Sequence, residues 1–317
     1  MTRAVLPLFL LLAALLPLAV SEYQVYLLTL TVIWAIMALS MGLVLGYVGQ
    51  INLGQIAFVA ISAYASSLLR LKLEWSFWIA APIALAAVVA VAAIVGLITL
   101  RLKGPFFILV MLAFAEIVRL ILANWHDMTN GPLGLRGIEP PEDILGLSFQ
   151  SKTGFYYLTL VVFAFCIVAL IRLVKSKTGR MLVAVREDEV LAEFVGIPLL
   201  RQKIIGLCIS ALIAGLAGVL LGPLLSILSP SQFTLFASVD MIVMVVVGGV
   251  GTLAGPIIGA IFLTYIPEVL AFANHFRPIL MGVVLIIVTL FAPQGILGIA
   301  RRILAGRPDT PSGGDND

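Results

Sequence analysis

Charged residues are scarce in this sequence. Lys, Arg, Asp and Glu make up 11% of the 317 residues, whereas apolar residues make up 62% and the mean hydropathy is +1.18. A soluble domain typically has about 25% charged and about 45–50% apolar residues. Too few charges are present to cover a surface in water. The composition therefore predicts an all-α membrane protein that crosses a bilayer many times.

Cysteine and histidine are also rare. Cys166 and Cys208 each lie inside an apolar run, where a cysteine behaves as a small buried hydrophobic residue, and no disulfide framework is indicated. His126 and His275 lie far apart without a neighbouring cluster of Cys, Asp or Glu. We therefore expect no metal site.

Motifs of nucleotide hydrolysis are absent too. No Gly-x-x-x-x-Gly-Lys-Ser/Thr phosphate loop occurs, so we do not expect the chain to hydrolyse ATP or to be an enzyme. No arginine-rich voltage sensor or carbonyl selectivity filter is present either, and no nucleic-acid partner is expected.

Long apolar runs fill most of the chain. A helix needs about 20 apolar residues to span the hydrocarbon, within a range of about 17–25. A block over 233–270 is too long for one span and is interrupted by glycine, so we divide it into two spans. The alternative that part of this block is re-entrant stays open. The sequence thus predicts ten spans, at about 4–20, 25–48, 51–69, 77–100, 105–123, 155–174, 204–225, 233–250, 256–270 and 278–300.

The first run has two interpretations. Residues 4–20 follow Arg3 and end near small residues, as in a signal peptide, but the run is also long enough to be a first span. We favour its retention, because the distribution of basic residues over the loops fits ten spans.

Basic residues predict the orientation, since Lys and Arg collect in short cytoplasmic loops. With both termini cytoplasmic, five basic residues lie outside: Arg70, Lys72, Arg136, Lys152 and Arg277. Thirteen lie inside: Arg3, Arg101, Lys103, Arg172, Lys175, Lys177, Arg180, Arg186, Arg201, Lys203, Arg301, Arg302 and Arg307. The sequence therefore predicts one transmembrane domain over 1–306, with an outer loop over 124–154, an inner loop over 175–203 and a disordered tail over 307–317.

The inner loop carries mixed charges and apolar residues. Gly196, Ile197 and Pro198 are expected to stop a helix there. One or two short amphipathic helices along the membrane face are predicted from the apolar positions Leu182, Val185, Leu191, Phe194 and Val195. A plain solvated loop is the alternative. The acidic residues of this loop, followed at fixed spacing by Ala192 and Gly196, resemble the segment of ABC importer permeases that docks on the ATP-binding subunit. The residues that this resemblance assigns to coupling are Arg180, Arg186, Glu187, Glu189, Ala192, Gly196 and Ile197.

Three further segments carry a resemblance that covers about 40–300. They are Gly49-Gln-Ile-Asn-Leu-Gly-Gln55, then Gly104-Pro-Phe-Phe107 with the stretch 112–138, and Gly248-Gly-Val-Gly-Thr-Leu-Ala-Gly-Pro256. In this order they resemble the LivM-type permeases of branched-chain amino-acid ABC importers. Two residues depart from that family: Ser62 stands where glycine is common, and Phe106 stands where tyrosine is common. Because serine is larger than glycine, close helix packing at position 62 is in question.

The resemblance implies a permease bundle in a bacterial inner membrane. It implies two ATP-binding subunits that hold ATP and Mg²⁺, a second related permease subunit, a periplasmic solute-binding protein and surrounding lipid, with no cofactor bound by this chain. The solute would be a branched-chain amino acid, or urea, a short amide or another amino acid. A secondary transporter or channel without an ATPase, and an assembly protein without transport activity, are the alternatives. The solute and the hetero- or homodimeric state of the permease pair stay open.

Polar residues within spans are candidates for the translocation path or the bundle interior. Asn52 and Gln55 begin a span and must face protein or water. Tyr64 follows in the same span. Glu116 and Arg119 are three apart on one helix and are expected to pair, either to stabilise the bundle or to border the path. Small residues that let helices approach closely are Gly248, Gly249, Gly251, Gly255 and Gly259.

Overall fold

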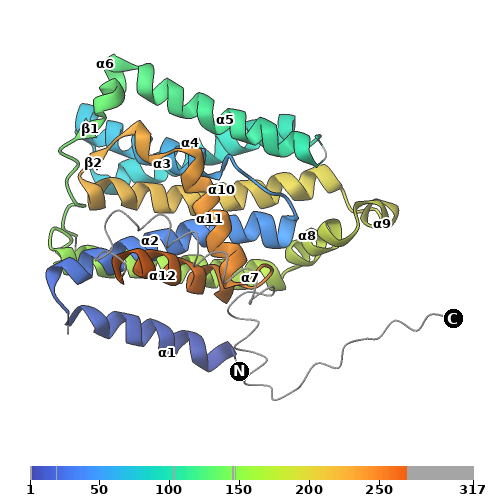
Figure 1. Cartoon of the computed structure of the whole chain (residues 1–317), viewed down its shortest axis with the longest axis horizontal. Helices are drawn as coiled ribbons and strands as arrows, with labels where there is room; N and C mark the ends of the chain where they lie inside the picture. The colour runs from blue at the N-terminus through green and yellow to red at the C-terminus, as the bar shows by residue number, and fades with distance from the viewer. Residues whose placement is uncertain (1, 19, 103, 145, 147, 270–317) are drawn as a thin grey trace.

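The computed structural model describes residues 2–18, 20–102, 104–144, 146 and 148–269, and its long helices lie side by side (Figure 1). The helices are α1 Thr2–Leu15, α2 Glu22–Leu43, α3 Gln55–Leu73, α4 Phe77–Thr99, α5 Pro105–Asn124, α6 His126–Thr129, α7 Lys152–Lys175, α8 Lys177–Glu187, α9 Glu189–Phe194, α10 Leu199–Leu225, α11 Leu235–Gly248 and α12 Ala254–Val269. A π-helical turn, Val44–Val48, extends α2, and short 3₁₀ turns are Leu16–Leu18, Gly131–Leu133 and Pro230–Gln232.

Seven of these helical segments are long and apolar enough to cross a membrane. They are Glu22–Val48, Gln55–Leu73, Phe77–Thr99, Pro105–Asn124, Lys152–Lys175, Leu199–Leu225 and Pro230–Gly248. The chain is thus a helical membrane protein with many spans, as predicted. Helix α1 has 14 residues and α12 has 16, so both are shorter than a usual span. The span expected at 278–300 lies outside the described residues, and the total of ten stays a prediction.

Helices α2 and α10 form the centre of the bundle. In their apolar stretches 78% and 67% of the residues are buried, against 22% in α4 and in α5. Helix α10 packs against α2, α3 and α4, and α2 packs against α7, α11 and α12 as well. The hydrophobic core therefore surrounds these two helices, whereas α4 and α5 keep broad apolar faces open to lipid or to another protein.

The two long loops lie at opposite ends of the bundle (Figure 1). At one end, strand β1 Leu135–Arg136 pairs antiparallel with β2 Ile227–Leu228, with Leu135 opposite Leu228. Helix α6 lies at this end too, which we call the β1–β2 end. Helices α8 and α9 lie at the other, the α8–α9 end. The outer and inner loops predicted from the charge pattern are therefore on different sides.

The glycine-rich block forms two helices, α11 and α12, that pack closely against each other. A Cβ atom at Gly248 would lie 1.8 Å from the Gly255 carbonyl oxygen, and one at Gly259 would lie 1.8 Å from the Met244 carbonyl oxygen. The backbone of Gly249 and Gly251 has positive φ, 122° and 77°, in the turn between them. These positions allow two backbones to approach where any side chain would clash.

Candidate functional site

Helix α8 begins the inner loop and packs against the bundle. The Ser176 hydroxyl accepts a hydrogen bond from the Gly179 backbone N–H at 3.2 Å and caps the helix. Leu182 is buried in a small apolar cluster with Val44 and Val48 of the π-helical turn. Helix α8 is thus anchored on the end of α2 by its apolar face.

Helix α9 is a separate element with its own start and stop. The Asp188 carboxylate accepts hydrogen bonds from the backbone N–H groups of Val190 and Leu191, at 2.9 and 3.0 Å. Gly196 has φ +81°, which ends the helix in a conformation that favours glycine. The Ile197 N–H donates to the carbonyl of Ala192, which is the buried residue of α9. The chain therefore turns sharply on both sides of a six-residue helix.

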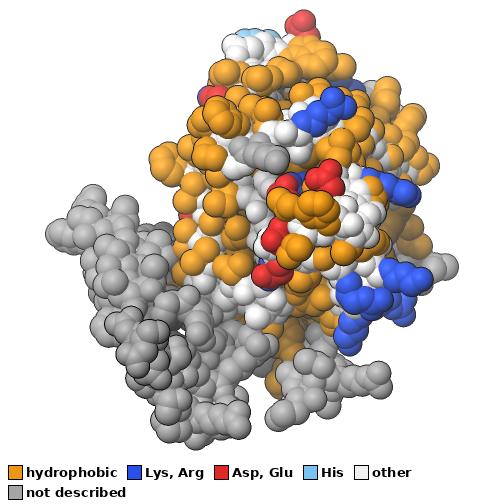
Figure 2. Space-filling view, turned by 90° about the vertical axis from the view of Figure 1, so that its right-hand side faces the viewer, with side chains coloured by type: hydrophobic (Ala, Val, Ile, Leu, Met, Phe, Trp, Pro, Cys, Tyr) orange, Lys and Arg blue, Asp and Glu red, His pale blue; other side chains and the backbone are white. Residues whose placement is uncertain are grey.

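The outward surface of this segment is apolar. Phe194 is 83% exposed, and Val190, Leu191 and Val195 are exposed as well. We call these four residues the apolar tip. Figure 2 shows the α8–α9 end, where an apolar group is bordered by acidic side chains. Helix α9 and its flanks supply these acids: Glu187, Asp188, Glu189 and Glu193. An exposed apolar group with a polar rim is typical of sites that bind a protein, a membrane or a ligand.

Arg186 connects this segment to the bundle. Its guanidinium donates a hydrogen bond to the Gly46 carbonyl in the π-helical turn and forms an ion pair with Glu187. Its Nη1 atom also lies 3.5 Å from where a Cβ of Gly251 would be. The Tyr47 hydroxyl donates to the Gly251 carbonyl at 3.3 Å. Arg186 thus lies where α8, α2 and the α11–α12 turn meet.

Glu189 has a partner within the chain. The Lys203 ammonium of α10 lies 2.6 Å from its carboxylate, and the Lys203 side chain is only 6% exposed. Arg180, by contrast, is exposed and donates to the Lys175 carbonyl at 3.3 Å. Five of the seven residues assigned to coupling fall into two groups, and Arg180 and Glu187 belong to neither. Ala192, Gly196 and Ile197 shape α9, whereas Arg186 and Glu189 tie the segment to the bundle.

A buried polar cluster joins the central helices. The Asn52 amide donates to the Gln55 side-chain carbonyl at 2.7 Å, and the Gln55 amide donates to the Ser210 hydroxyl at 2.7 Å and the Ser40 hydroxyl at 3.0 Å. The Ile56 N–H donates to the Ser238 hydroxyl at 3.3 Å. Each of these five polar side chains is fully buried. The cluster thus links α2, α3, α10 and α11, and its hydrogen bonds are made within the protein.

Tyr64 is apart from this cluster. It lies nine residues further along α3, which is about 13 Å at the usual helical rise. Its hydroxyl donates to the Leu228 carbonyl of β2 at 3.1 Å, and its ring packs edge-on against Phe233 at 6.0 Å. Asn52, Gln55 and Tyr64 are all buried, but they do not form one site.

Glu116 and Arg119 pair as expected, in an ion pair along α5. Their side chains are 45% and 27% exposed. The buried residues of α5 are Phe107, Met111, Ala115 and Leu122. The pair is therefore outside the interior of this chain, a position compatible both with a partly solvated pair that stabilises the bundle and with a pair that borders the path.

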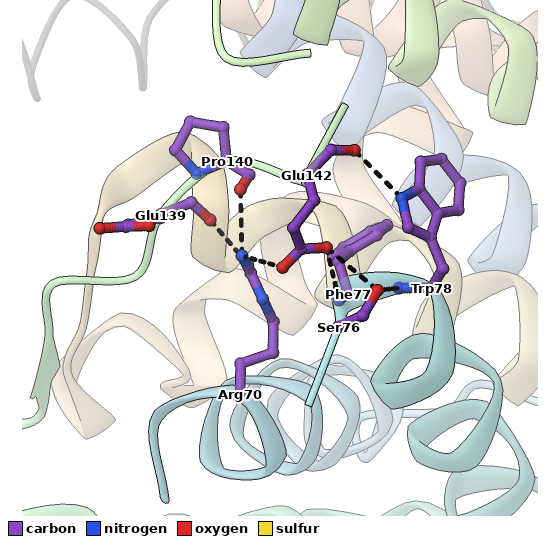
Figure 3. Close-up of polar contacts among 7 residues, drawn as sticks. All are labelled: Arg70, Ser76, Phe77, Trp78, Glu139, Pro140 and Glu142. Carbon is purple, nitrogen blue, oxygen red and sulfur yellow. Dashed lines mark hydrogen bonds and ion pairs between the residues drawn. The ribbon is translucent and has the colours of Figure 1, made fainter. Parts of the chain in front are cut away.

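The β1–β2 end holds an ion pair that the sequence did not indicate (Figure 3). Arg70 at the end of α3 pairs with Glu142 of the outer loop at 3.3 Å and donates to the carbonyls of Glu139 and Pro140. The Glu142 carboxylate also accepts from the Phe77 N–H at 2.8 Å and the Ser76 hydroxyl at 3.2 Å. No local pattern signals partners about seventy residues apart.

Glu142 is held in its charged form. Partial burial acts to raise the pKa of its carboxyl group, but the Phe77 N–H, the Arg70 guanidinium and the Ser76 hydroxyl outweigh burial and keep that pKa below its usual range. Among the described residues, no group of three or more His, Cys, Asp or Glu side chains is placed to hold a metal ion.

The sequence matches a family model described as "Branched-chain amino acid transport system / permease component" over residues 23–289. It is 31% identical over 307 residues to the high-affinity branched-chain amino acid transport system permease protein LivM of Escherichia coli, covering 90% of this chain and 72% of that relative. The LivM protein of Salmonella typhimurium is 30% identical over 308 residues, with the same coverage.

A second type of relative matches more weakly. The permease protein LivH of Salmonella typhimurium, from the same kind of transport system, is 25% identical over 287 residues, covering 85% of this chain and 92% of the relative. No solved structure gives a significant match to the chain. The similarity thus extends to two named permeases.

Proposed function

Because this chain belongs to the permease family of branched-chain amino-acid transport systems, we propose that it is one membrane-spanning subunit of an ABC importer for these solutes. It is a multi-pass protein of the inner membrane. In this proposal the importer moves branched-chain amino acids into the cytoplasm by ATP-driven alternating access. Two partner subunits hold ATP and Mg²⁺, so the role of this chain is non-catalytic.

The apolar tip is the observation that carries the coupling role. Four exposed apolar side chains on and beside a six-residue helix are unfavourable in water, and the acidic rim makes insertion into lipid unfavourable as well. A cleft in an ATP-binding subunit avoids both of these costs. It offers apolar walls to Phe194 and Leu191 and polar partners to the acids. We propose that α9 fills such a cleft.

Arg186 connects docking to the membrane domain in this proposal. A shift of α8 and α9 pulls on the π-helical turn of α2, because Arg186 donates to the Gly46 carbonyl there, and it reaches the α11–α12 turn through the Tyr47 hydroxyl, which donates to the Gly251 carbonyl. Helix α2 is the most buried span, so its displacement affects the whole bundle. Movement of the ATP-binding subunits thereby reaches the helices that open and close the path.

The exposed face of α5 is proposed to meet the second permease subunit. A charged pair that is 27–45% exposed is costly against hydrocarbon, whereas a protein interface or an aqueous path accommodates it. The similarity to both LivM and LivH relatives is consistent with two related subunits side by side. The translocation path then runs between them, bordered on this chain by Glu116 and Arg119.

The orientation follows from the basic residues. We propose ten spans with both termini in the cytoplasm, which puts the α8–α9 end inside and the β1–β2 end outside. The outer loop, fixed by Arg70 and Glu142, then faces the periplasmic solute-binding protein. This arrangement gives each partner its own end of the bundle.

Phe194→Ser tests the docking role of the apolar tip. Phe194 is 83% exposed, so the change leaves the fold intact. Loss of an aromatic anchor at an interface costs about 2 kcal/mol or more, so we expect binding to the ATP-binding subunit to weaken more than about tenfold. Co-purification and titration of the detergent-solubilised complex measure this binding.

Leu133→Ser is the matched control. Leu133 is also an exposed apolar residue, 69% exposed, but lies at the β1–β2 end. Its substitution should leave the affinity for the ATP-binding subunit unchanged. Equal affinity for wild type and Phe194→Ser would contradict docking through α9.

A further inference from the structure

A groove runs between α7 and α10 on the surface of the bundle. These helices make little direct contact, and the groove between them has a volume of about 420 Å³. Its walls are almost entirely apolar, formed by Phe165, Ala169 and Leu173 on α7 and by Ile209, Leu212 and Leu216 on α10. Its volume is in the range of small-molecule sites, about 300–1,000 Å³.

The groove has the length of one leaflet. Along α7 it extends from Phe165 to Ser176, eleven residues, or about 16 Å at the usual helical rise of 1.5 Å. The hydrocarbon core of a bilayer is about 30 Å thick, so one leaflet is about 15 Å. The groove therefore runs from the α8–α9 end to about mid-membrane, as a single acyl chain does.

A basic cluster stands at the end of the groove that is nearest α8. Arg172 lines the groove and is exposed, and Lys175 and Lys177 are exposed just beyond it. Within the described part of the chain, none of the three side chains has an acidic partner or a hydrogen-bond acceptor. An apolar channel that ends at unpaired cations is complementary to a molecule with an apolar tail and an anionic head.

We propose that this groove binds an anionic phospholipid, with one acyl chain between α7 and α10 and the phosphate at Arg172. Basic pockets at the membrane surface attract anionic headgroups electrostatically. The site belongs to the inner leaflet if the proposed orientation holds, and this assignment and the choice of lipid over a second permease rest on the proposed function. The second permease is a less suitable occupant, because the ion pair of α5 already marks a separate face for it.

Quenching by brominated lipid tests the site directly. Phe165→Trp introduces a reporter in the groove of the full-length chain, in which Trp34, Trp75, Trp78 and Trp125 are replaced by Phe. The protein is placed in nanodiscs of phosphatidylglycerol and phosphatidylcholine, with bromine on the acyl chains of one lipid at a time. We expect phosphatidylglycerol to occupy the groove about fivefold more than its mole fraction predicts, which corresponds to about 1 kcal/mol.

Arg172→Gln should remove most of this preference. Arg101→Gln, a basic residue at the α4–α5 turn that does not line the groove, should keep it. Quenching by both lipids in proportion to their mole fractions would reduce the groove to ordinary lipid contact and overturn the proposal. Quenching by neither lipid would show that protein covers the groove, and would overturn it too.

A second measurement avoids the tryptophan replacements. Native mass spectrometry of the otherwise unchanged chain counts the anionic lipids that survive purification. We expect fewer in Arg172→Gln and in Ala169→Phe, which fills the groove, than in wild type or Arg101→Gln. Equal counts in all four proteins would contradict the site. Both measurements are independent of ATP and of the direction of transport, so their failure would leave the proposed function standing.

Discussion

At the scale of single residues, two partly exposed ion pairs lie outside the hydrophobic core of this chain. Arg70 and Glu142 fix the outer loop on the α3–α4 turn, and Glu116 and Arg119 lie on the open side of α5. The first pair is between distant segments and holds a loop in place. The second is between residues three apart and needs an external surface or water to remain charged.

Exchanging the charges of α5 tests whether Glu116 and Arg119 act as a pair. Glu116→Arg and Arg119→Glu alone each place two like charges side by side, so we expect solute uptake to fall several-fold in each. The double exchange restores the attraction and should recover part of that loss, since coupled residues typically interact by about 0.5–3 kcal/mol. Uptake in cells, normalised to the amount of inserted protein, measures this. No recovery in the double variant would limit the pair to a local role.

Glu142 predicts a dependence of stability on pH. Its pKa is lowered in the folded protein, so its stabilising effect is fully present above the ordinary carboxyl pKa and is lost as pH falls through the lower, folded value. The side chain is 47% exposed, which limits the effect. We expect Glu142→Gln to lower the melting temperature by about 1–2 °C at pH 7.

The difference between Glu142→Gln and wild type should shrink as the pH falls below about 4.5. Asp143→Asn, at the next position in the same loop, is the matched control. We expect it to change the melting temperature only slightly and separately from the effect of Glu142. Thermal unfolding of the purified chain at each pH gives both values. A difference that stays constant down to pH 3 would contradict a charged Glu142 as the stabilising group.

Close packing at Ser62 shows how a residue-level expectation can change. The family that this chain resembles commonly has glycine at this position, which suggests close packing of α3 there. Helices α3 and α10 still pack tightly at Ser62, because α10 supplies the glycine, Gly218. A Cβ at Gly218 would lie 2.1 Å from the Ser62 hydroxyl oxygen, and that hydroxyl donates to the Val59 carbonyl at 3.0 Å.

At the scale of elements, α9 depends on its surroundings for its direction. A six-residue helix is not stable alone, since isolated helices shorter than about 12–15 residues are marginal in water. The Asp188 cap and Gly196 set its ends, and the Glu189–Lys203 ion pair fixes it on α10. Lys203 is nearly buried, so removal of its partner leaves a cation without compensation.

Reversing this ion pair tests whether it positions α9. Glu189→Lys places two cations together, so we expect α9 to shift and binding of the ATP-binding subunit to weaken about tenfold or more. Glu189→Lys combined with Lys203→Glu should restore much of the binding, while Glu74→Lys, an exposed acid at the end of α3 and away from the docking surface, serves as control. If the double variant binds no better than Glu189→Lys, Glu189 contacts the partner directly and does not act through Lys203.

The sequence predicted helical segments in the inner loop but not their faces. Leu182, Val185, Leu191, Phe194 and Val195 were expected together on the membrane face, yet only Leu182 and Val185 are buried. Asp188 adopts an extended backbone, with φ −155°, and separates α8 from α9. The helical period therefore restarts at Glu189, and Leu191, Phe194 and Val195 point outward and form the apolar tip together with Val190.

At the scale of the whole molecule, the order and approximate length of seven spans could be predicted, but their arrangement could not. Helix α4 is at least as apolar as α2, although 22% of its apolar stretch is buried against 78% in α2. Lipid is as apolar as a protein core, so composition does not separate a lipid-facing helix from a central one. The buried cluster around Gln55 depends on this arrangement and was predicted only as two polar residues that avoid lipid.

The central claim is that this chain forms a solute path whose motor lies on other subunits. Reconstitution in proteoliposomes tests it most directly. The vesicles contain this chain, a LivH-type permease and ATP-binding subunits. ATP is supplied on the side of the ATP-binding subunits, and a leucine-loaded binding protein on the opposite side. We expect leucine transport and ATP hydrolysis to rise together, and both to fall several-fold in Phe194→Ser, whereas Leu133→Ser keeps the wild-type affinity for the ATP-binding subunits. Leucine transport that proceeds without ATP, or that is unaffected by Phe194→Ser, would contradict the account.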